Sequence, residues 1–314
     1  MRYKILGRTG LKVSELSFGC SGFGDVYGNV SLETSNDLIA KAVENGINYF
    51  DTSPYYGAGR SEEVLGTIFP KFEREKLIIS SKCGRSGKLK NDNTIESIFN
   101  FSAESLTDSI YNSLNVLNLD YLDIAFLHDI EFEKSKSKIC EESIPALQKL
   151  KEKGLIRNIG ISGFPIEILN DYLVNPSLEI DVVLTYGHYS LQSNLLNNYI
   201  NEWKDRNVGI ICASPFSMGL LTNKKPPKWH PASEKLKKVS EEAHRFCVRN
   251  DQNISKTALT KCLKNENIDT VLTGMYTMKE LEDAIDVVGN PICPKFVEKV
   301  ESVFKRAGVY NKMW

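Results

Sequence analysis

Four polar residues of complementary chemistry lie at or just after the ends of apolar, β-branched stretches. They are Asp51, Tyr56, Lys82 and His128. Polar residues of these types are unusual in buried strands. A tyrosine phenol, with a free pKa of about 10, is a poor acid or base near neutral pH. A nearby ammonium would stabilise the phenolate and lower that pKa, a carboxylate could hold the ammonium, and an imidazole could bond the reacting oxygen. Together these groups could couple proton transfer to hydride transfer.

The elements that must position these residues alternate along the chain between short apolar strands and longer segments of helical periodicity. The predicted strands are Leu16–Phe18, Tyr49–Asp51, Leu77–Lys82, Ile124–His128, Ile156–Ser162, Val182–Thr185, Gly209–Ala213 and Val271–Thr273. The predicted helices are Ser31–Asn45, Ser61–Ile68, Ser102–Leu117 and Ile139–Lys153, and further helices begin near Pro165, Asn194, Glu234 and Met278. A series of this length favours closure into a (β/α)8 barrel, in which loops after the strands carry the active site.

A doubly wound open sheet is the rival architecture. It would usually carry G-x-G-x-x-G after the first strand, whereas Gly19, Gly22 and Gly24 are spaced differently. Pro, Gly and Ser residues also form no interdomain linker. We therefore predict an α/β fold with a single (β/α)8 TIM-barrel domain over residues 1–314.

Two additions to the barrel are expected. Tyr3–Leu6 and Leu11–Val13 predict a short N-terminal hairpin that closes the barrel bottom, and Phe296–Phe304 predicts an extra C-terminal helix. Long connections that follow strands are more often functional than accidental. Three are present, at 83–101, 129–138 and 215–233, and the first is either a solvated insertion or a segment that reshapes the pocket.

Composition argues against several classes of protein. The chain has 314 residues, with 39 Lys and Arg against 40 Asp and Glu, so no basic surface for nucleic acid is expected. No segment approaches the roughly 18 apolar residues of a membrane span, and the N-terminus lacks a signal-peptide pattern. The seven cysteines show no C-x-x-C spacing, which favours reduced thiols. We expect a cytoplasmic protein without nucleic-acid, membrane or metal binding.

The segments around the four polar residues resemble the aldo-keto reductase superfamily. FDTSPYYGAGRSEEVLG contains Asp51 and Tyr56, IISSK ends in Lys82, and DIAFLHD contains His128. Within the superfamily the chain most resembles the L-galactose dehydrogenase branch, through SKCGR, HDIEF, IPALQKLKEKG, ASPFSMGLLT and PPKWHPAS. The resemblance covers nearly the whole chain and implies a (β/α)8 barrel that uses a nicotinamide cofactor without metal.

The resemblance implies a role for each of the four residues. Tyr56 would be the acid/base, Lys82 would lower its pKa, Asp51 would pair with Lys82, and His128 would orient the substrate oxygen. The implied reaction is NAD-dependent oxidation of an aldose at C1 to the aldonolactone, with L-galactose, L-fucose or D-arabinose as candidate sugars. A monomer is the common state in the family.

Other functions are weighed against this one. The alternative within the family is an NADPH-dependent aldehyde or ketone reductase. A barrel that binds cofactor without turnover, as a sensor or accessory subunit, is a third possibility that the intact set of four residues disfavours. A metal-dependent isomerase on the same fold would need a cluster of His, Asp and Glu ligands, but the four histidines lie in different segments.

Cofactor contacts are expected from three regions. Ser162 would bond the nicotinamide carboxamide, although Gly163 replaces the asparagine usual in the family. Tyr186 would stack on the nicotinamide, because Ala213 stands where the family usually has the stacking tyrosine. The loop after the seventh strand would hold the pyrophosphate through backbone amides. From this loop we predict contacts by Ser214, Pro215, Phe216, Met218, Gly219 and Leu220.

The stretch after the eighth strand bears on the choice between NAD and NADP. Gly274 and Glu280 stand where NADP-using relatives carry the lysine and arginine that hold the 2′-phosphate. A carboxylate repels phosphate and can accept a hydrogen bond from a free 2′-hydroxyl. NAD is therefore expected rather than NADP, with Asp283 as a further cofactor contact. A one-residue shift of the alignment would instead place Lys279 near a phosphate.

Overall fold

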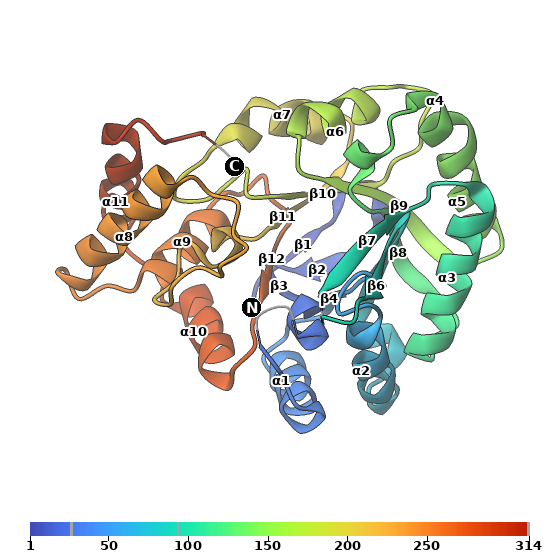
Figure 1. Cartoon of the computed structure of the whole chain (residues 1–314), viewed down its shortest axis with the longest axis horizontal. Helices are drawn as coiled ribbons and strands as arrows, with labels where there is room; N and C mark the ends of the chain where they lie inside the picture. Colours follow the sequence, from blue (N-terminus) through green and yellow to red (C-terminus); the bar gives the residue numbers. More distant parts are fainter. Residues whose placement is uncertain (26–27, 93, 313–314) are drawn as a thin grey trace.

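The computed structural model describes residues 1–25, 28–92 and 94–312. Its centre is a closed barrel of parallel strands, and helices surround the barrel (Figure 1). In barrel order the strands are β3 Leu16–Gly19, β4 Tyr49–Asp51, β5 Ile78–Cys83, β8 Leu122–Leu127, β9 Ile156–Gly163, β10 Val182–Tyr186, β11 Gly209–Ala213 and β12 Thr270–Gly274. The predicted (β/α)8 architecture is confirmed, and the open sheet is excluded because β12 pairs with β3.

Several of the helices begin at capped positions. Ser31, Ser102 and Ser233 each accept a hydrogen bond from a backbone N–H of the first turn of the helix that follows. The helices are α1 Leu32–Glu44, α2 Arg60–Ile68, α3 Ala103–Leu117, α4 Lys136–Lys138, α5 Ile144–Glu152, α6 Ile166–Leu173, α7 Ile200–Asp205, α8 Glu234–Val248, α9 Ile254–Leu263, α10 Met278–Gly289 and α11 Pro294–Arg306.

Two helical regions differ from the prediction. The helix expected near Asn194 is a 3-10 turn, Leu195–Asn198, followed by the six-residue α7. The connection between β11 and β12 holds two helices, α8 and α9, whereas the sequence predicts only the first. α9 is buried along most of its length, including Thr257, Thr260 and Lys261, so it lacks the clear polar face that makes helical periodicity visible.

The N-terminal hairpin closes the base of the barrel, as predicted. Strand β1, Tyr3–Ile5, pairs antiparallel with β2, Lys12–Ser14. Leu6 in the connecting turn is fully buried and packs in the barrel interior with apolar side chains of the surrounding strands. These side chains include Tyr49, Ile78, Ile124, Val182 and Ile211. The interior below the site is therefore a packed core rather than a channel.

The predicted C-terminal helix is present as α11. It packs against α8 and α9 around a separate apolar cluster that includes Leu236, Ala258, Val300 and Phe304 (left of Figure 1). Within the described ranges, the helices are all too short or too polar to cross a membrane.

The long 83–101 connection contains a β-hairpin that the sequence analysis did not predict. Strand β6, Arg85–Leu89, pairs antiparallel with β7, Ile95–Phe99. The hairpin packs closely on the turn that carries Tyr56. A Cβ atom at Gly87 would lie only 3.1 Å from the Tyr55 carbonyl oxygen. The insertion is therefore part of the wall beside the four polar residues.

The barrel base allows a direct test of the packing. Replacing Leu6 by Ala removes a fully buried side chain and should lower the free energy of unfolding by about 2–5 kcal/mol, measured by denaturant unfolding. Ile5→Ala is the matched control, because Ile5 is 54% exposed. Equal effects of the two variants would show that the hairpin does not close the core.

Candidate active site

The buried ammonium of Lys82 joins three of the four predicted residues. Lys82 Nζ donates to Asp51 Oδ2 at 2.6 Å, to the Thr52 carbonyl at 2.8 Å and to the Tyr56 hydroxyl at 2.9 Å. An ammonium has three donors, so these partners satisfy all of them. Ser80 Oγ donates to the other Asp51 oxygen at 2.7 Å. The network holds a charged pair in a position where both side chains are almost fully buried.

Neighbouring strands bring these residues together. β4, β5 and β8 are consecutive in the barrel, so Asp51, Lys82 and His128 reach the same end of it. Tyr56 returns to this end because the chain turns sharply after it. Gly57 has φ +67°, and a Cβ atom there would lie 2.5 Å from Gly24 Cα, so no larger residue fits without movement.

His128 faces the tyrosine with its ring nearly perpendicular. The two ring centres lie 6.0 Å apart at an interplanar angle of 88°. His128 Nδ1 is hydrogen-bonded to Ser53 Oγ at 3.2 Å, and Ser53 Oγ also accepts from the Tyr55 N–H at 3.1 Å. Burial and the charges of Lys82 and Arg85 hold the His128 pKa well below its usual value. The imidazole is therefore neutral at physiological pH.

A second charged group borders His128. The carboxylate of Asp129 is buried, with Oδ2 3.7 Å from His128 Nε2. Arg85 forms an ion pair with Asp129, and its guanidinium lies 3.6 Å from the centre of the Tyr55 ring. The Tyr186 hydroxyl donates to the other Asp129 oxygen at 3.4 Å. Sequence reasoning did not assign Asp129 or Arg85, although both lie in segments, HDIEF and SKCGR, that carry the family resemblance.

Glu131 explains why a glycine ends β9. A Cβ atom at Gly163 would lie 2.5 Å from Glu131 Oε2. Glu131 Oε1 accepts from the Phe164 N–H at 3.0 Å, whereas Oε2 has no hydrogen-bond partner among the described residues. Burial and the nearby Asp129 raise the pKa of Glu131 to about 7. The usual asparagine at this position would therefore clash with a second carboxyl group at the rim.

The remaining nicotinamide-side predictions lie at the same rim. Ser162 Oγ donates to the Leu127 carbonyl at 3.3 Å and accepts from the Asp129 N–H at 3.4 Å. These distances are long for hydrogen bonds of a hydroxyl, so the group can turn to another partner. Tyr186 ends β10, and its ring centre lies 5.4 Å from that of Phe164. The structure thus brings Ser162 and Tyr186 to the rim that carries His128.

The loop after β11 forms a turn with strained backbone angles. Ser214, Ser217 and Met218 have φ of 57°, 48° and 51°, which only glycine adopts at little cost. The N–H groups of Phe216 and Met218 donate no hydrogen bond within the described part of the chain. Backbone N–H groups exposed in such turns form anion-binding concavities. The backbone of this turn is therefore suited to binding an anion, and the predicted pyrophosphate contact stays a prediction.

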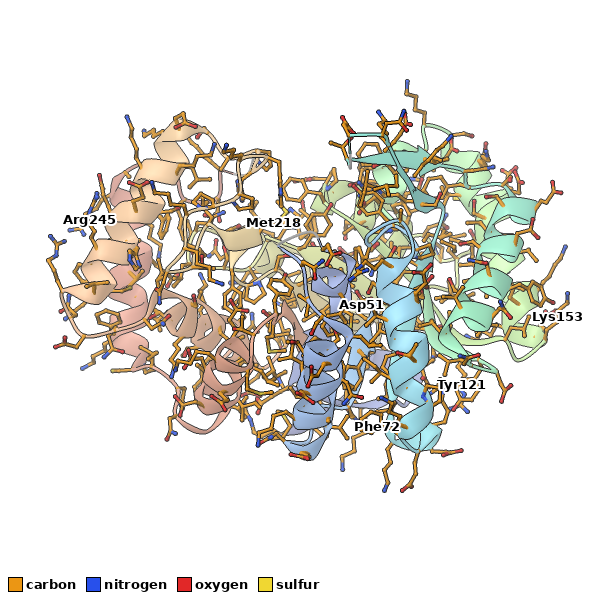
Figure 2. The ribbon with its side chains drawn as sticks, turned by 60° about the horizontal axis from the view of Figure 1, so that its bottom comes forward. Asp51, Phe72, Tyr121, Lys153, Met218 and Arg245 are labelled. Carbon is orange, nitrogen blue, oxygen red and sulfur yellow. The ribbon has the colours of Figure 1, made fainter. Side chains whose placement is uncertain are left out.

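Other members of this loop have structural roles that the sequence does not show. Leu220 is buried in the cluster between α8 and α11, Pro215 is buried, and Gly219 has φ +97°. In Figure 2, Met218 and Asp51 lie over the middle of the molecule, between Arg245 and Lys153 at its two sides.

Glu280 and Asp283, which follow β12, both form hydrogen bonds or ion pairs within the protein. Glu280 forms a capping box with Thr277, and Oε2 accepts from the Tyr276 N–H at 2.9 Å. Glu280 Oε1 accepts from Lys224 of the long loop at 2.9 Å. Asp283 pairs with Lys256 at 3.1 Å and with Lys279 at 2.8 Å, and a Cβ atom on Gly274 would lie 2.4 Å from the Tyr276 hydroxyl. The two carboxylates that the sequence assigns to the cofactor therefore also have partners within the fold.

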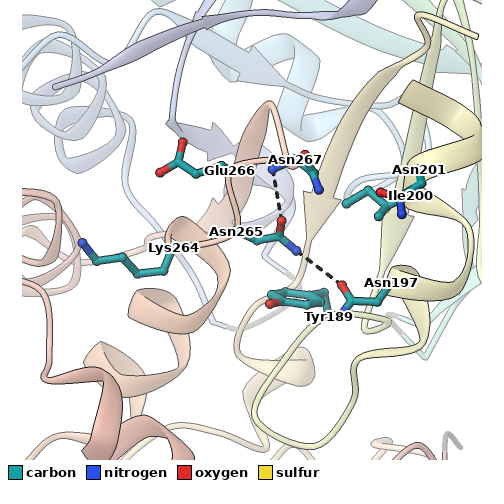
Figure 3. Close-up of a pocket in the computed structure, with 8 residues that line it drawn as sticks. All are labelled: Tyr189, Asn197, Ile200, Asn201, Lys264, Asn265, Glu266 and Asn267. Carbon is teal, nitrogen blue, oxygen red and sulfur yellow. Dashed lines mark hydrogen bonds between the residues drawn. The ribbon is translucent and has the colours of Figure 1, made fainter. Parts of the chain in front are cut away.

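A separate hollow lies outside this rim. It has a volume of about 480 Å³ and is lined by Tyr189, Asn197, Ile200, Asn201, Lys264, Asn265, Glu266 and Asn267 (Figure 3). None of the predicted site residues lines it.

In the described ranges, no group of three or more His, Cys, Asp or Glu side chains could hold a metal ion.

Comparisons with known proteins show that the chain is similar to one family of enzymes. The model of the Aldo/keto reductase family matches residues 15–305. The chain is 42% identical to the L-galactose dehydrogenase of Arabidopsis thaliana over 91% of this chain and 87% of that protein. It is 31% identical to the D-arabinose 1-dehydrogenase of Saccharomyces cerevisiae over 88% and 86% of the two chains. A solved aldo-keto reductase of Bacillus halodurans, 24% identical, superimposes with a TM-score of 0.79 over 99% of both chains.

The buried Glu62, which lies behind the site, should make the free energy of unfolding depend on pH. Its carboxyl accepts from Ser81, the neighbour of Lys82, at 2.6 Å, and burial raises its pKa from 4.5 to about 7. The folded protein therefore retains this proton in a pH window where the unfolded chain has released it, so the free energy of unfolding falls as pH rises through the window. The Glu62→Gln variant should not lose this stability, so its free energy of unfolding relative to that of wild type should rise by about 3 kcal/mol from about pH 4 to about pH 8.

Denaturant unfolding across this pH range measures the effect. Glu63→Gln is the matched control, because the adjacent Glu63 is exposed and should give a constant difference from wild type. A Glu62→Gln difference that is also constant with pH would mean that Glu62 is ionised in the folded protein.

Proposed function

This chain belongs to the aldo/keto reductase family, and on that basis we propose that it oxidises an aldose at C1 to the aldonolactone with NAD. The family uses nicotinamide cofactors, and the chain is an oxidoreductase that acts on CH–OH groups. We further propose that residues 1–314 form one barrel domain that acts as a cytoplasmic monomer. Relatives named L-galactose dehydrogenase and D-arabinose 1-dehydrogenase support the choice of an aldose.

The observation that carries the proposal is the contact between Lys82 and the Tyr56 hydroxyl. In this proposal Tyr56 accepts the proton of the anomeric hydroxyl as the C1–H bond breaks. An ammonium at 2.9 Å favours the phenolate that must accept it. Asp51 keeps the ammonium in place and balances its charge, so neither leaves the buried position. A bound nicotinamide would take up the hydride from C1.

His128 orients the reacting oxygen in the same proposal. In this proposal Ser53, 3.2 Å from Nδ1, is the donor of that hydrogen bond, so the neutral imidazole carries its proton on Nε2 and can donate it to the sugar oxygen. Asp129 Oδ2, 3.7 Å from Nε2, is close enough to accept from a hydroxyl on the same sugar. A buried carboxylate at this place supports a polyol substrate over a simple aldehyde. The identity of the sugar depends on side chains from several loops.

The cofactor side rests on backbone and side-chain groups of four strand ends. Ser162 would hold the carboxamide, Tyr186 would stack on the ring, and the turn at Ser214–Leu220 would hold the pyrophosphate. Glu280 supports NAD, because its negative charge repels a 2′-phosphate. Lys224, 2.9 Å from Glu280, partly offsets that repulsion. The preference for NAD is therefore expected to be moderate rather than absolute.

Tyr56→Phe tests the catalytic assignment. It should lower kcat for sugar oxidation by about 10³-fold, because it removes the acid/base but retains the ring. The assay follows NADH formation with L-galactose, L-fucose, D-arabinose and D-glucose. Tyr55→Phe removes the neighbouring hydroxyl and should leave kcat nearly unchanged. Reduction of simple aldehydes with NADPH, without sugar oxidation, would instead favour the reductase.

Glu280→Gln tests the cofactor preference. Glutamine retains the capping box but removes the negative charge, and it frees Lys224 to approach a phosphate. The ratio of kcat/KM with NADP to that with NAD should rise by about tenfold. An unchanged ratio would mean that Glu280 serves only as a helix cap.

A further inference from the structure

His230 lies in the PPKWHPAS segment, which the proposed reaction leaves without a role. It belongs to the long 215–233 loop, and its side chain is only 3% exposed. His230 Nε2 lies 2.9 Å from the Ser217 carbonyl oxygen, and Nδ1 accepts from the Ala232 N–H at 3.0 Å. Because Nδ1 is an acceptor, the proton of the neutral ring must be on Nε2, which then donates to Ser217. The two contacts therefore select one tautomer.

The neutral form is favoured at physiological pH. Burial and the nearby charge of Lys237 lower the His230 pKa, although the bond to the Ser217 carbonyl acts in the opposite direction. The ring of the neighbouring Trp229 is nearly parallel to the imidazole, with 6.2 Å between the ring centres. The neutral ring is the form that both contacts to the backbone require.

The peptide unit that His230 holds is the one that presents a free donor. The Ser217 carbonyl and the Met218 N–H belong to the same planar, trans peptide group, so they point in opposite directions. Ser217 and Met218 on its two sides both have left-handed backbone angles. Such a pair is costly and persists only where surrounding contacts determine it. His230 Nε2 and the Leu220 N–H, at 2.9 and 3.1 Å, both bond the Ser217 carbonyl, and a fixed carbonyl also fixes the direction of the Met218 N–H.

We propose that His230 is a positioning residue for the cofactor, and that it acts by locking the Ser217–Met218 peptide so that the Met218 N–H faces the pyrophosphate. The inference rests on the proposed function, because it needs a nicotinamide dinucleotide in this loop. It assigns no contact between His230 and the cofactor. The imidazole acts only through the orientation of one peptide group.

Two conservative variants separate the contacts of His230. Glutamine can place its amide nitrogen near the position of Nε2 and so still donate to Ser217. Asparagine is shorter; it can accept from the Ala232 N–H, as Nδ1 does, but does not reach Ser217. Both variants are first compared with wild type by circular dichroism and thermal unfolding, so that a loss of fold is recognised. His244→Asn on α8 is the control for the substitution itself.

Calorimetric titration with NAD and with ADP-ribose, which carries the pyrophosphate without the nicotinamide, gives the readout. His230→Asn should raise the Kd of both ligands by about tenfold, the loss expected for one hydrogen bond that positions a charged contact. His230→Gln should stay close to wild type. In steady-state assays His230→Asn should raise KM for NAD, while kcat and KM for the sugar stay nearly constant.

Several results would overturn the inference. Equal Kd values for wild type and both variants would show that the peptide needs no lock. A parallel rise in the KM values for NAD and for sugar, or a loss of thermal stability without a change in Kd, would indicate a general structural role. If wild type binds neither NAD nor NADP, the proposed function itself fails, and that result is distinct because it appears before any substitution.

Discussion

The need to satisfy a buried ammonium is the constraint on which the site depends. A charge moved out of water is strongly destabilising unless each donor finds an acceptor. Lys82 meets this requirement with a carboxylate, a backbone carbonyl and a phenol, which come from β4, from the turn after it and from Tyr56. The close approach of Gly57 and Gly24 holds that turn in place. The contacts that satisfy the buried Lys82 ammonium therefore also place the Tyr56 hydroxyl next to it.

The proposed substrate side of the rim contains a second charged group, opposite in sign to Lys82. Asp129 is buried beside a neutral His128, and Arg85 from the β6–β7 hairpin balances its charge. Arg85 also stacks on Tyr55, next to the catalytic tyrosine of the proposal. The hairpin therefore connects the electrostatics of the substrate side to the turn that carries Tyr56. The hairpin thus supplies a second cation, in addition to Lys82 of β5.

The proposed cofactor side is built differently, from backbone geometry rather than from buried charge. The turn after β11 has several residues in left-handed conformations and leaves N–H groups unbonded within the described chain. The loop that follows returns to the turn through His230 and reaches α10 through the Lys224–Glu280 ion pair. One side of the rim thus presents paired charges, whereas the other presents oriented peptide groups. This division suits proton transfer on one side and anion binding on the other.

The sequence alone determines features that local periodicity and local motifs encode. The alternation of strands and helices predicts the barrel, and strand-end positions place Asp51, Lys82 and His128 at one rim before any coordinates are known. α9 escapes prediction because neighbours on all sides bury it, so its polar and apolar residues do not alternate at helical spacing. Three relationships in the site join residues that lie far apart in the sequence. Arg85 pairs with Asp129, 44 positions away, and His230 bonds Ser217, 13 positions away. Glu131 occupies the space that a side chain at position 163, 32 positions away, would need. Only the tertiary structure decides these contacts, because each depends on where separate loops meet in space.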